Sequence, residues 1–90
     1  MSWYDDFITR TPGVQGGEPV VAGTRTPVRT IAVLYHETYA YDLTKVLASL
    51  SHLTPNQVDA ALQYYRDHQA EIDALTRGHR QALKEFIAAS

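Results

Sequence analysis

The sequence predicts a mostly α-helical domain that begins with a short β-hairpin. Two observations support this prediction. Residues 5–26 are rich in β-branched and turn-forming residues, whereas from residue 27 onward apolar residues recur at the three- and four-residue spacing of a helix. The 90 residues of the chain suffice for one hydrophobic core and not for two, so a single domain is expected.

Composition and charge narrow the possible classes of function. Apolar residues make up 44% of the chain and charged residues 20%, which is typical of a globular protein. The net charge of -2 gives no overall positive field to attract nucleic acid or an anionic membrane. The chain has no cysteine, and neither a signal peptide nor a membrane-spanning run is recognisable. A cytoplasmic protein without membrane contact is expected.

The predicted hairpin pairs FITRT (7–11) with PVVAGT (19–24) through the connection PGVQGG (12–17). The two outer segments are β-branched, and the proline and glycines between them favour turns. An isolated two-stranded hairpin is only marginally stable, so a helix or a second chain has to cover this one. The hairpin is therefore a candidate dimerisation element.

Three helices are expected between residues 27 and 68. The first runs from about Pro27 to Thr38, with Thr26 as its N-cap. Apolar residues at helical spacing then indicate a second, short helix that follows an N-cap at Asp42 and ends near Leu50. A short turn, SHL (51–53), separates this helix from the third.

The start of the third helix is the best-marked boundary in the chain. In LTPNQV (53–58), Thr54 is expected as the N-cap and Gln57 as its partner in a capping box, with Pro55 as the first helical residue. The expected buried face consists of Val58, Ala61, Leu62 and Tyr65. Because neighbouring helical residues point about 100° apart, Tyr64 is expected at the surface or in an interface.

Residues 69–90 are predicted to form a C-terminal helical arm, of one or two helices, on a core of residues 1–68. Apolar residues continue at helical spacing, and Gly78 interrupts them. Two roles remain open for the arm. It either binds a partner, in which case a fragment that ends at His68 is expected to fold, or it packs back so that Phe86 and Ile87 close the domain's own core.

Two motifs give the chain a family resemblance. GGEPVVAGTRTPV (16–28), followed by LTPNQVDAALQYYRDHQAEID (53–73), resembles the small bacterial and archaeal family catalogued as domain of unknown function 433. The resemblance spans roughly residues 8–75. It implies a homeodomain-like trihelical helix-turn-helix core. It also implies the role of an antitoxin in a type II toxin-antitoxin pair, which represses its own promoter and blocks a PIN-like ribonuclease toxin.

The chain departs from the family pattern at Gln69, where members often have proline. The helix break expected after His68 is therefore either a bend or absent here. The segment TRGHRQALKEFIAAS (76–90) lies beyond the common core.

The candidate DNA-binding residues form two groups. Arg10, Arg25 and Arg29 would make a cationic edge that contacts phosphate or enters a minor groove. The N-terminal face of the third helix would expose polar side chains that can bond base edges, together with one alanine. Its members are Asn56, Gln57, Ala60 and Gln63.

Each group also has a structural interpretation. The Gly-Thr-Arg segment can serve as a tight turn at Gly23, with Arg25 on the surface or paired with Glu18 or Asp42. The face of the third helix can be an ordinary solvated surface, since Asp59 and Asp67 on the same helix would repel a DNA backbone and Gln57 is engaged in the capping box.

The candidate toxin-binding residues follow from the resemblance and from the amphipathic arm. An amphipathic helix can bury its apolar face on a nuclease and set an arginine against the carboxylates of the active site, with Arg77 or Arg80 as the candidate for that contact. The predicted contacts are Tyr64, Ile72, Leu75, Arg77, Arg80 and Phe86.

No catalytic, cofactor or metal site is predicted. His68 and Glu71 have the spacing of a helical ligand pair, but two ligands do not make a metal site. Ser49, Ser51 and His52 are neighbours without any oxyanion-stabilising pattern. The expected function is a homodimeric, DNA-binding antitoxin that is not an enzyme. The alternative is a protein-interaction or dimerisation module without sequence-specific DNA binding, which the acidic net charge favours.

Overall fold

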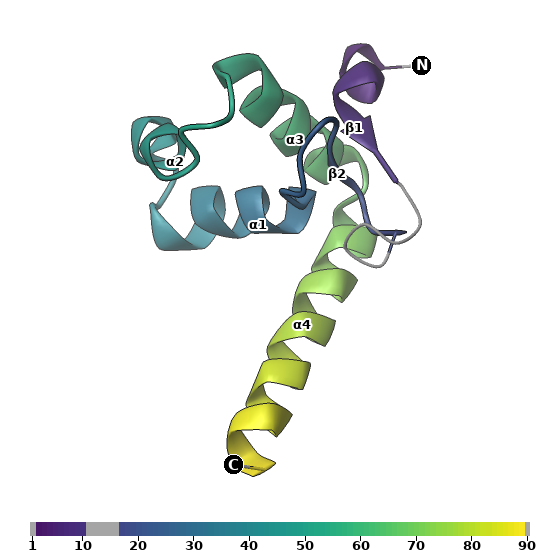
Figure 1. Cartoon of the computed structure of the whole chain (residues 1–90), viewed down its shortest axis with the longest axis vertical. Coiled ribbons are helices and arrows are strands. Elements are labelled where there is room, and N and C mark those ends of the chain that lie inside the picture. Colours follow the sequence, from purple (N-terminus) through teal and green to yellow (C-terminus); the bar gives the residue numbers. More distant parts are fainter. Residues whose placement is uncertain (1, 11–16, 90) are drawn as a thin grey trace.

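The protein, described by a computed structural model, has a helical body from which one long helix extends (Figure 1). The description covers residues 2–10 and 17–89, with side chains up to residue 80. The elements are η1 (Trp3–Phe7), β1 (Ile8–Thr9), β2 (Val20–Val21), α1 (Val28–Val33), the π-helical turn η3 (Leu34–Thr38), α2 (Leu43–Ser49), α3 (Pro55–Asp67) and α4 (Gln69–Ala89). The predicted class, mostly helical with a short N-terminal hairpin, is confirmed.

The hairpin is shorter than predicted and is covered by its own chain. β1 and β2 pair antiparallel, with Ile8 opposite Val21 and Thr9 opposite Val20. Both strands contact α3, and Val21 is fully buried. Thr11 and the turn residues 12–16 lie outside the described residues. Because α3 supplies the cover that the hairpin needs, the hairpin no longer requires a second chain.

The turn that follows β2 has the predicted glycine geometry. Gly23 has a φ of +80°, a conformation that glycine adopts without a steric penalty. The Thr24 amide donates to the Val21 carbonyl at 3.0 Å. The Thr24 hydroxyl accepts from the Thr26 amide at 3.1 Å. The Val28 amide then donates to the Pro19 carbonyl at 3.0 Å, which fixes the start of α1 beside β2.

The first helix extends to the predicted end but has a different cap. Pro27 occupies the N-cap of α1, and its carbonyl accepts from the Thr30 amide at 3.1 Å. The prediction of Thr26 as N-cap is wrong, because the Thr26 hydroxyl is hydrogen-bonded to Nε2 of His52 at 2.8 Å instead. Helical backbone continues through η3, and the Tyr39 amide donates to the Leu34 carbonyl at 2.9 Å, the i to i−5 spacing of a π-turn.

The predicted caps of α2 and α3 are both confirmed. Asp42 Oδ1 accepts from the Lys45 amide at 3.2 Å. Thr54 Oγ1 accepts from the Gln57 amide at 3.2 Å, and Gln57 Oε1 accepts from the Thr54 amide at 2.7 Å. Each such cap stabilises its helix by about 1 kcal/mol. These contacts fix where α3 begins, and therefore which of its side chains face outward.

The core lies between the hairpin, α1, α2, α3 and the first part of α4. It combines aliphatic residues with two tyrosines: Tyr4, Val21, Val28, Ile31, Val46, Leu53, Val58, Ala60, Ala61, Tyr64 and Ile72. The predictions for Tyr64 and Tyr65 are wrong: Tyr64 is 8% exposed, whereas Tyr65 is only half-buried. Tyr4 of η1 covers Tyr64, with ring centroids 5.8 Å apart. This contact packs η1 against α3. Because the two tyrosines are far apart in the sequence, no pattern of neighbouring residues predicts it.

The break at His68 is present, and the arm is a single helix. α3 ends at Asp67, His68 has φ −126° and ψ 36°, and α4 runs unbroken from Gln69 to Ala89 through Gly78. Ile72 on the first part of α4 is fully buried. No described helix has the length and apolarity needed to cross a membrane.

Candidate functional site

Arg10, the first residue of the predicted cationic edge, is bound within the protein. Its Nη2 donates to the Tyr64 hydroxyl at 2.5 Å and forms an ion pair with the carboxylate of Glu71. The guanidinium also lies 5.9 Å from the centroid of the Tyr64 ring. The bond from Arg10 lowers the pKa of Glu71, so this carboxylate stays charged as the pH falls. Arg10 therefore ties the end of β1 to α4.

A second group of contacts surrounds the break at His68. The Tyr64 ring stacks on the His68 ring, with centroids 4.2 Å apart. The Tyr4 hydroxyl donates to Asp67 Oδ2 at 2.5 Å, and this hydrogen bond raises the pKa of Tyr4. These contacts hold η1 against the junction of α3 and α4. They explain how a non-helical residue between two helices keeps a fixed geometry.

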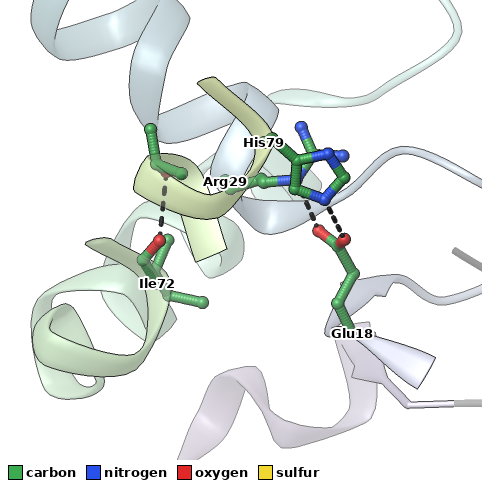
Figure 2. A network of polar contacts seen from close by, with 5 residues as sticks. Glu18, Arg29, Ile72 and His79 are labelled. Atoms are coloured by element: carbon green, nitrogen blue, oxygen red, sulfur yellow. Dashed lines mark hydrogen bonds and ion pairs between the residues drawn. The ribbon is translucent and has the colours of Figure 1, made fainter. Parts of the chain in front are cut away.

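Arg29, the third predicted arginine, is paired with the buried carboxylate of Glu18 (Figure 2). Arg29 Nε lies 2.9 Å from Glu18 Oε1, and His79 Nε2 lies 3.2 Å from Glu18 Oε2. The Glu18 side chain is 5% exposed and that of Arg29 is 19% exposed. The Arg29 N–H and Glu18 Oε1 do not align as a hydrogen bond, and neither atom has another partner among the described residues, so their contact is ionic.

The three arginines consequently do not form one cationic edge. Glu71 holds Arg10 and Glu18 holds Arg29, whereas Arg25 is exposed. The two acids that the sequence suggested for Arg25 are engaged elsewhere, since Glu18 pairs with Arg29 and Asp42 caps α2.

Arg25 belongs to a loop that is fixed beside the turn between α2 and α3. The hydrogen bond between Thr26 and His52 joins the two segments directly. Asn56, in the first turn of α3, is exposed. The hydrogen bond thus places the loop that carries the exposed Arg25 next to the turn that precedes α3. In the first turn of α3, Pro55 has no N–H and Thr54 binds the Gln57 amide, so the Asn56 amide is the one left to favour an anion.

The predicted base-contacting residues of α3 are not equivalent. Asn56 is exposed, whereas Gln57 is half-buried and engaged in the capping box. Ala60 is fully buried, so the prediction of an exposed Ala60 is wrong; it packs in the core beside Ala61, which widens the buried face of the helix. Gln63 is half-buried and its Nε2 donates to Asp67 Oδ1 at 3.4 Å.

The predicted toxin contacts are divided between the core and the surface. Ile72 and Tyr64 are buried and Leu75 is half-buried against the core, so none of the three is a freely exposed contact. Arg77 is exposed, and it has no ion-pair partner among the described side chains. Arg80 Nη2 donates to Glu37 Oε2 at 2.6 Å. The side chain of Phe86 lies outside the described residues.

A groove that the sequence did not predict lies between η3 and α3. Its volume is about 550 Å³, and aromatic and charged side chains line most of it, among them Tyr35, His36, Tyr41, Asp59, Tyr65 and Arg66. The grouping of tyrosines around residue 40 was the available signal. The sequence could not show that α3 completes the groove. The described side chains include no cluster of three or more histidine, aspartate or glutamate residues that could hold a metal ion.

The comparisons with known proteins agree on one family. Residues 8–65 match the family model described as "Protein of unknown function (DUF433)". Among solved structures, the chain is similar to the crystal structure of a DUF433 member protein from Anabaena variabilis ATCC 29413. The two are 36% identical with a TM-score of 0.67, and the match covers 78% of this chain and 67% of that chain. No curated protein matches the chain.

Proposed function

The chain belongs to the DUF433 family, and from this premise we propose that it is an autorepressing antitoxin that binds operator DNA and inhibits a PIN-like ribonuclease. The observation that carries the DNA-binding part is the hydrogen bond between Thr26 and His52. It holds the loop of Arg25 against the turn that precedes α3. In this proposal α2 and α3 form a homeodomain-like helix-turn-helix, with α3 as the recognition helix.

The two exposed side chains at this end of α3 have different roles in the proposal. Arg25 contacts phosphate together with the Asn56 amide, since Pro55 has no N–H and the Gln57 amide is held in the capping box. These contacts fix the position of the helix on the duplex. Asn56 bonds a base edge in the major groove. Asp59 is exposed one turn after Asn56 and would repel phosphate. The proposal therefore assigns the contacts with the DNA phosphates to Arg25 and the start of α3, and none to the rest of the helix.

We expect Arg25→Ala to weaken binding to the DNA upstream of the gene on every sequence tested. In a plot of the logarithm of the binding constant against the logarithm of the salt concentration, loss of one phosphate contact also reduces the steepness of the slope by about one. Asn56→Ala instead changes which base pairs are preferred. Fluorescence anisotropy titrations at several salt concentrations measure both effects. Light scattering of the complex tests the proposed homodimer on two half-sites.

Arg66→Ala is the matched control for Arg25→Ala. Arg66 is an exposed arginine in the last turn of α3, ten residues beyond Asn56. Its removal changes the net charge equally but should leave DNA affinity near the wild-type value. An Arg25→Ala protein that binds like the wild type at every salt concentration would contradict the proposed face.

The inhibitory part of the proposal assigns the exposed surface of α4 to the nuclease. The helix extends away from the body (Figure 1), and Arg77 is exposed on it. An arginine can bind carboxylates through two parallel hydrogen bonds, which suits the acidic active site that the family resemblance implies. Arg80 contributes if it exchanges Glu37 for a carboxylate of the partner, since both side chains are more than half exposed.

Arg77→Glu is expected to abolish co-purification with the product of an adjacent nuclease gene, because it sets a carboxylate against carboxylates. Arg66→Glu, with the same charge reversal on α3, should retain the complex. Both variants should keep the wild-type circular dichroism spectrum. A stable complex with Arg77→Glu would exclude this contact.

The alternative function is a protein-interaction module that does not read DNA sequence. Its support is that carboxylates neutralise both Arg10 and Arg29, in a chain of net charge -2. Failure of the wild-type protein to bind its upstream DNA, with co-purification of the neighbouring gene product intact, would favour this alternative.

A further inference from the structure

Four rings form an aromatic cluster in the groove between η3 and α3, with His36 and Tyr41 exposed and Tyr35 and Tyr65 half-buried. The centroid of the His36 ring lies 5.1 Å from Tyr35, 5.4 Å from Tyr41 and 5.2 Å from Tyr65. Tyr35 and Tyr41 are 5.5 Å apart and nearly perpendicular. Neither of the proposed activities uses these rings. Aromatic rings that line a groove together, two of them exposed, are typical of a surface that contacts a ligand or a partner.

The backbone at the edge of this groove is held in an unfavourable conformation. Ala40 has a φ of +48° and Tyr41 a φ of +71°, although neither residue is glycine. Two hydrogen bonds hold the turn in this conformation. The Tyr41 amide donates to the Tyr35 carbonyl at 2.7 Å, and the Asp42 amide donates to the Tyr39 carbonyl at 3.0 Å. Tyr41, which is 63% exposed, lines the groove in this conformation. Retained strain of this kind is typical of binding sites.

The groove contains charges of both signs. Its lining includes the carboxylates of Glu37 and Asp59 and the single guanidinium of Arg66. Glu37 is engaged by Arg80, while Asp59 has no ion-pair partner among the described side chains. A carboxylate beside aromatic faces is the arrangement that binds a cation, because the ring quadrupole and the carboxylate attract the same charge.

We propose that this groove binds an arginine side chain that a partner polypeptide presents. A planar guanidinium can stack on a tyrosine ring while it donates two parallel hydrogen bonds to a carboxylate, which an ammonium group cannot do. Asp59 is the carboxylate in this proposal, and Tyr41 and Tyr35 supply the rings. The lining also includes Gln69, an amide that can bond the backbone of the bound segment, and Gln63, whose amide donates to Asp67. A nucleotide is the competing occupant, because Arg66 in the lining can bind a phosphate.

The proposal does not depend on the antitoxin role, because it uses none of Arg25, Asn56 or Arg77. The probe is the peptide acetyl-Gly-Arg-Gly-amide, titrated into the ¹⁵N-labelled full chain and followed by NMR. Shift changes are expected to concentrate in residues 35–41 and 59–69. The citrulline analogue has the same shape without the charge, and it should bind roughly two- to fivefold more weakly. Equal binding of the two peptides, or shift changes spread elsewhere, would overturn the proposal.

Two variants separate the ring from the carboxylate. Tyr41→Gly removes the ring, and glycine accepts the φ of +71°, so the protein should stay folded. Asp59→Asn removes the charge from an exposed position. Each should weaken the arginine peptide roughly two- to fivefold. Trp3→Ala, which removes an aromatic that is 57% exposed on η1, should change nothing.

Adenosine monophosphate is the competing probe. If it occupies the groove more tightly than the arginine peptide, the surface is a nucleotide site and the proposal is wrong. Unchanged affinity of the arginine peptide for both Tyr41→Gly and Asp59→Asn would likewise overturn it.

Discussion

Truncation after His68 is expected to leave an unfolded or molten fragment, whereas truncation after Arg80 leaves a folded domain. Ile72 is fully buried, and removing such a side chain alone costs about 2–5 kcal/mol. The shorter fragment also loses the Arg10 bond to Glu71 and the Tyr65 bond to Asp73. A small domain has only about 5–15 kcal/mol of stability to lose. This expectation replaces the sequence-based one, in which residues 1–68 fold alone.

The point substitution Ile72→Ala tests the same contact in the full chain. It should lower the free energy of unfolding by about 3 kcal/mol, measured by urea denaturation. The control is Arg77→Ala, because Arg77 is exposed on the same helix. This substitution should change the free energy of unfolding by less than about 0.5 kcal/mol. A cooperative thermal transition in fragment 1–68 would show that α4 is not part of the core.

Glu18→Ala is expected to destabilise the protein by about 3 kcal/mol, because it leaves the largely buried Arg29 without its carboxylate. This loss of stability is at the lower end of the range expected when one partner of a buried ion pair is removed. The reason is that the Arg29 side chain is 19% exposed, so water can reach part of it. His79 loses a partner as well, so α4 is held less firmly to the segment before β2. Thermal and urea unfolding measure the change.

Glu37→Ala is the control for Glu18→Ala. It removes the Arg80–Glu37 ion pair, whose side chains are 56% and 54% exposed, and exposed pairs contribute at most about 1 kcal/mol. The double substitution Glu18→Leu with Arg29→Met removes both buried charges and should recover much of the lost stability. Equal effects of Glu18→Ala and Glu37→Ala would mean that burial does not strengthen the Glu18 contact.

The elements that the sequence predicted correctly depend on near neighbours. The caps at Asp42 and Thr54 use partners three residues away, so the residue types alone indicate them. The predictions that fail depend on distant partners. Thr26 is bound by a residue 26 positions away, and Tyr64 is covered by η1. Propensity and periodicity contain no information about such partners.

In the candidate site, too, the features that depend on near neighbours were predicted and those that depend on distant partners were not. Sequence reasoning found Arg25 and Asn56, which remain exposed, because turn and cap signals place them on loops and helix ends. It could not anticipate that Glu71 binds Arg10 or that Glu18 binds Arg29, since each pair joins segments that only the fold brings together. The aromatic groove was visible only as a grouping of tyrosines, because α3 supplies its other side.

The ties between the hairpin and α4 also determine the order in which the chain folds. The Arg10–Glu71 and Glu18–His79 contacts each join residues 61 positions apart. Contacts at such separation form late, because a long loop has to close before they contribute any energy, whereas the capped helices between them form locally. During synthesis on the ribosome, Arg10 and Glu18 therefore have no partner until Glu71 and His79 have been made. The nascent chain stays open to proteases and chaperones until residues 71–79 emerge.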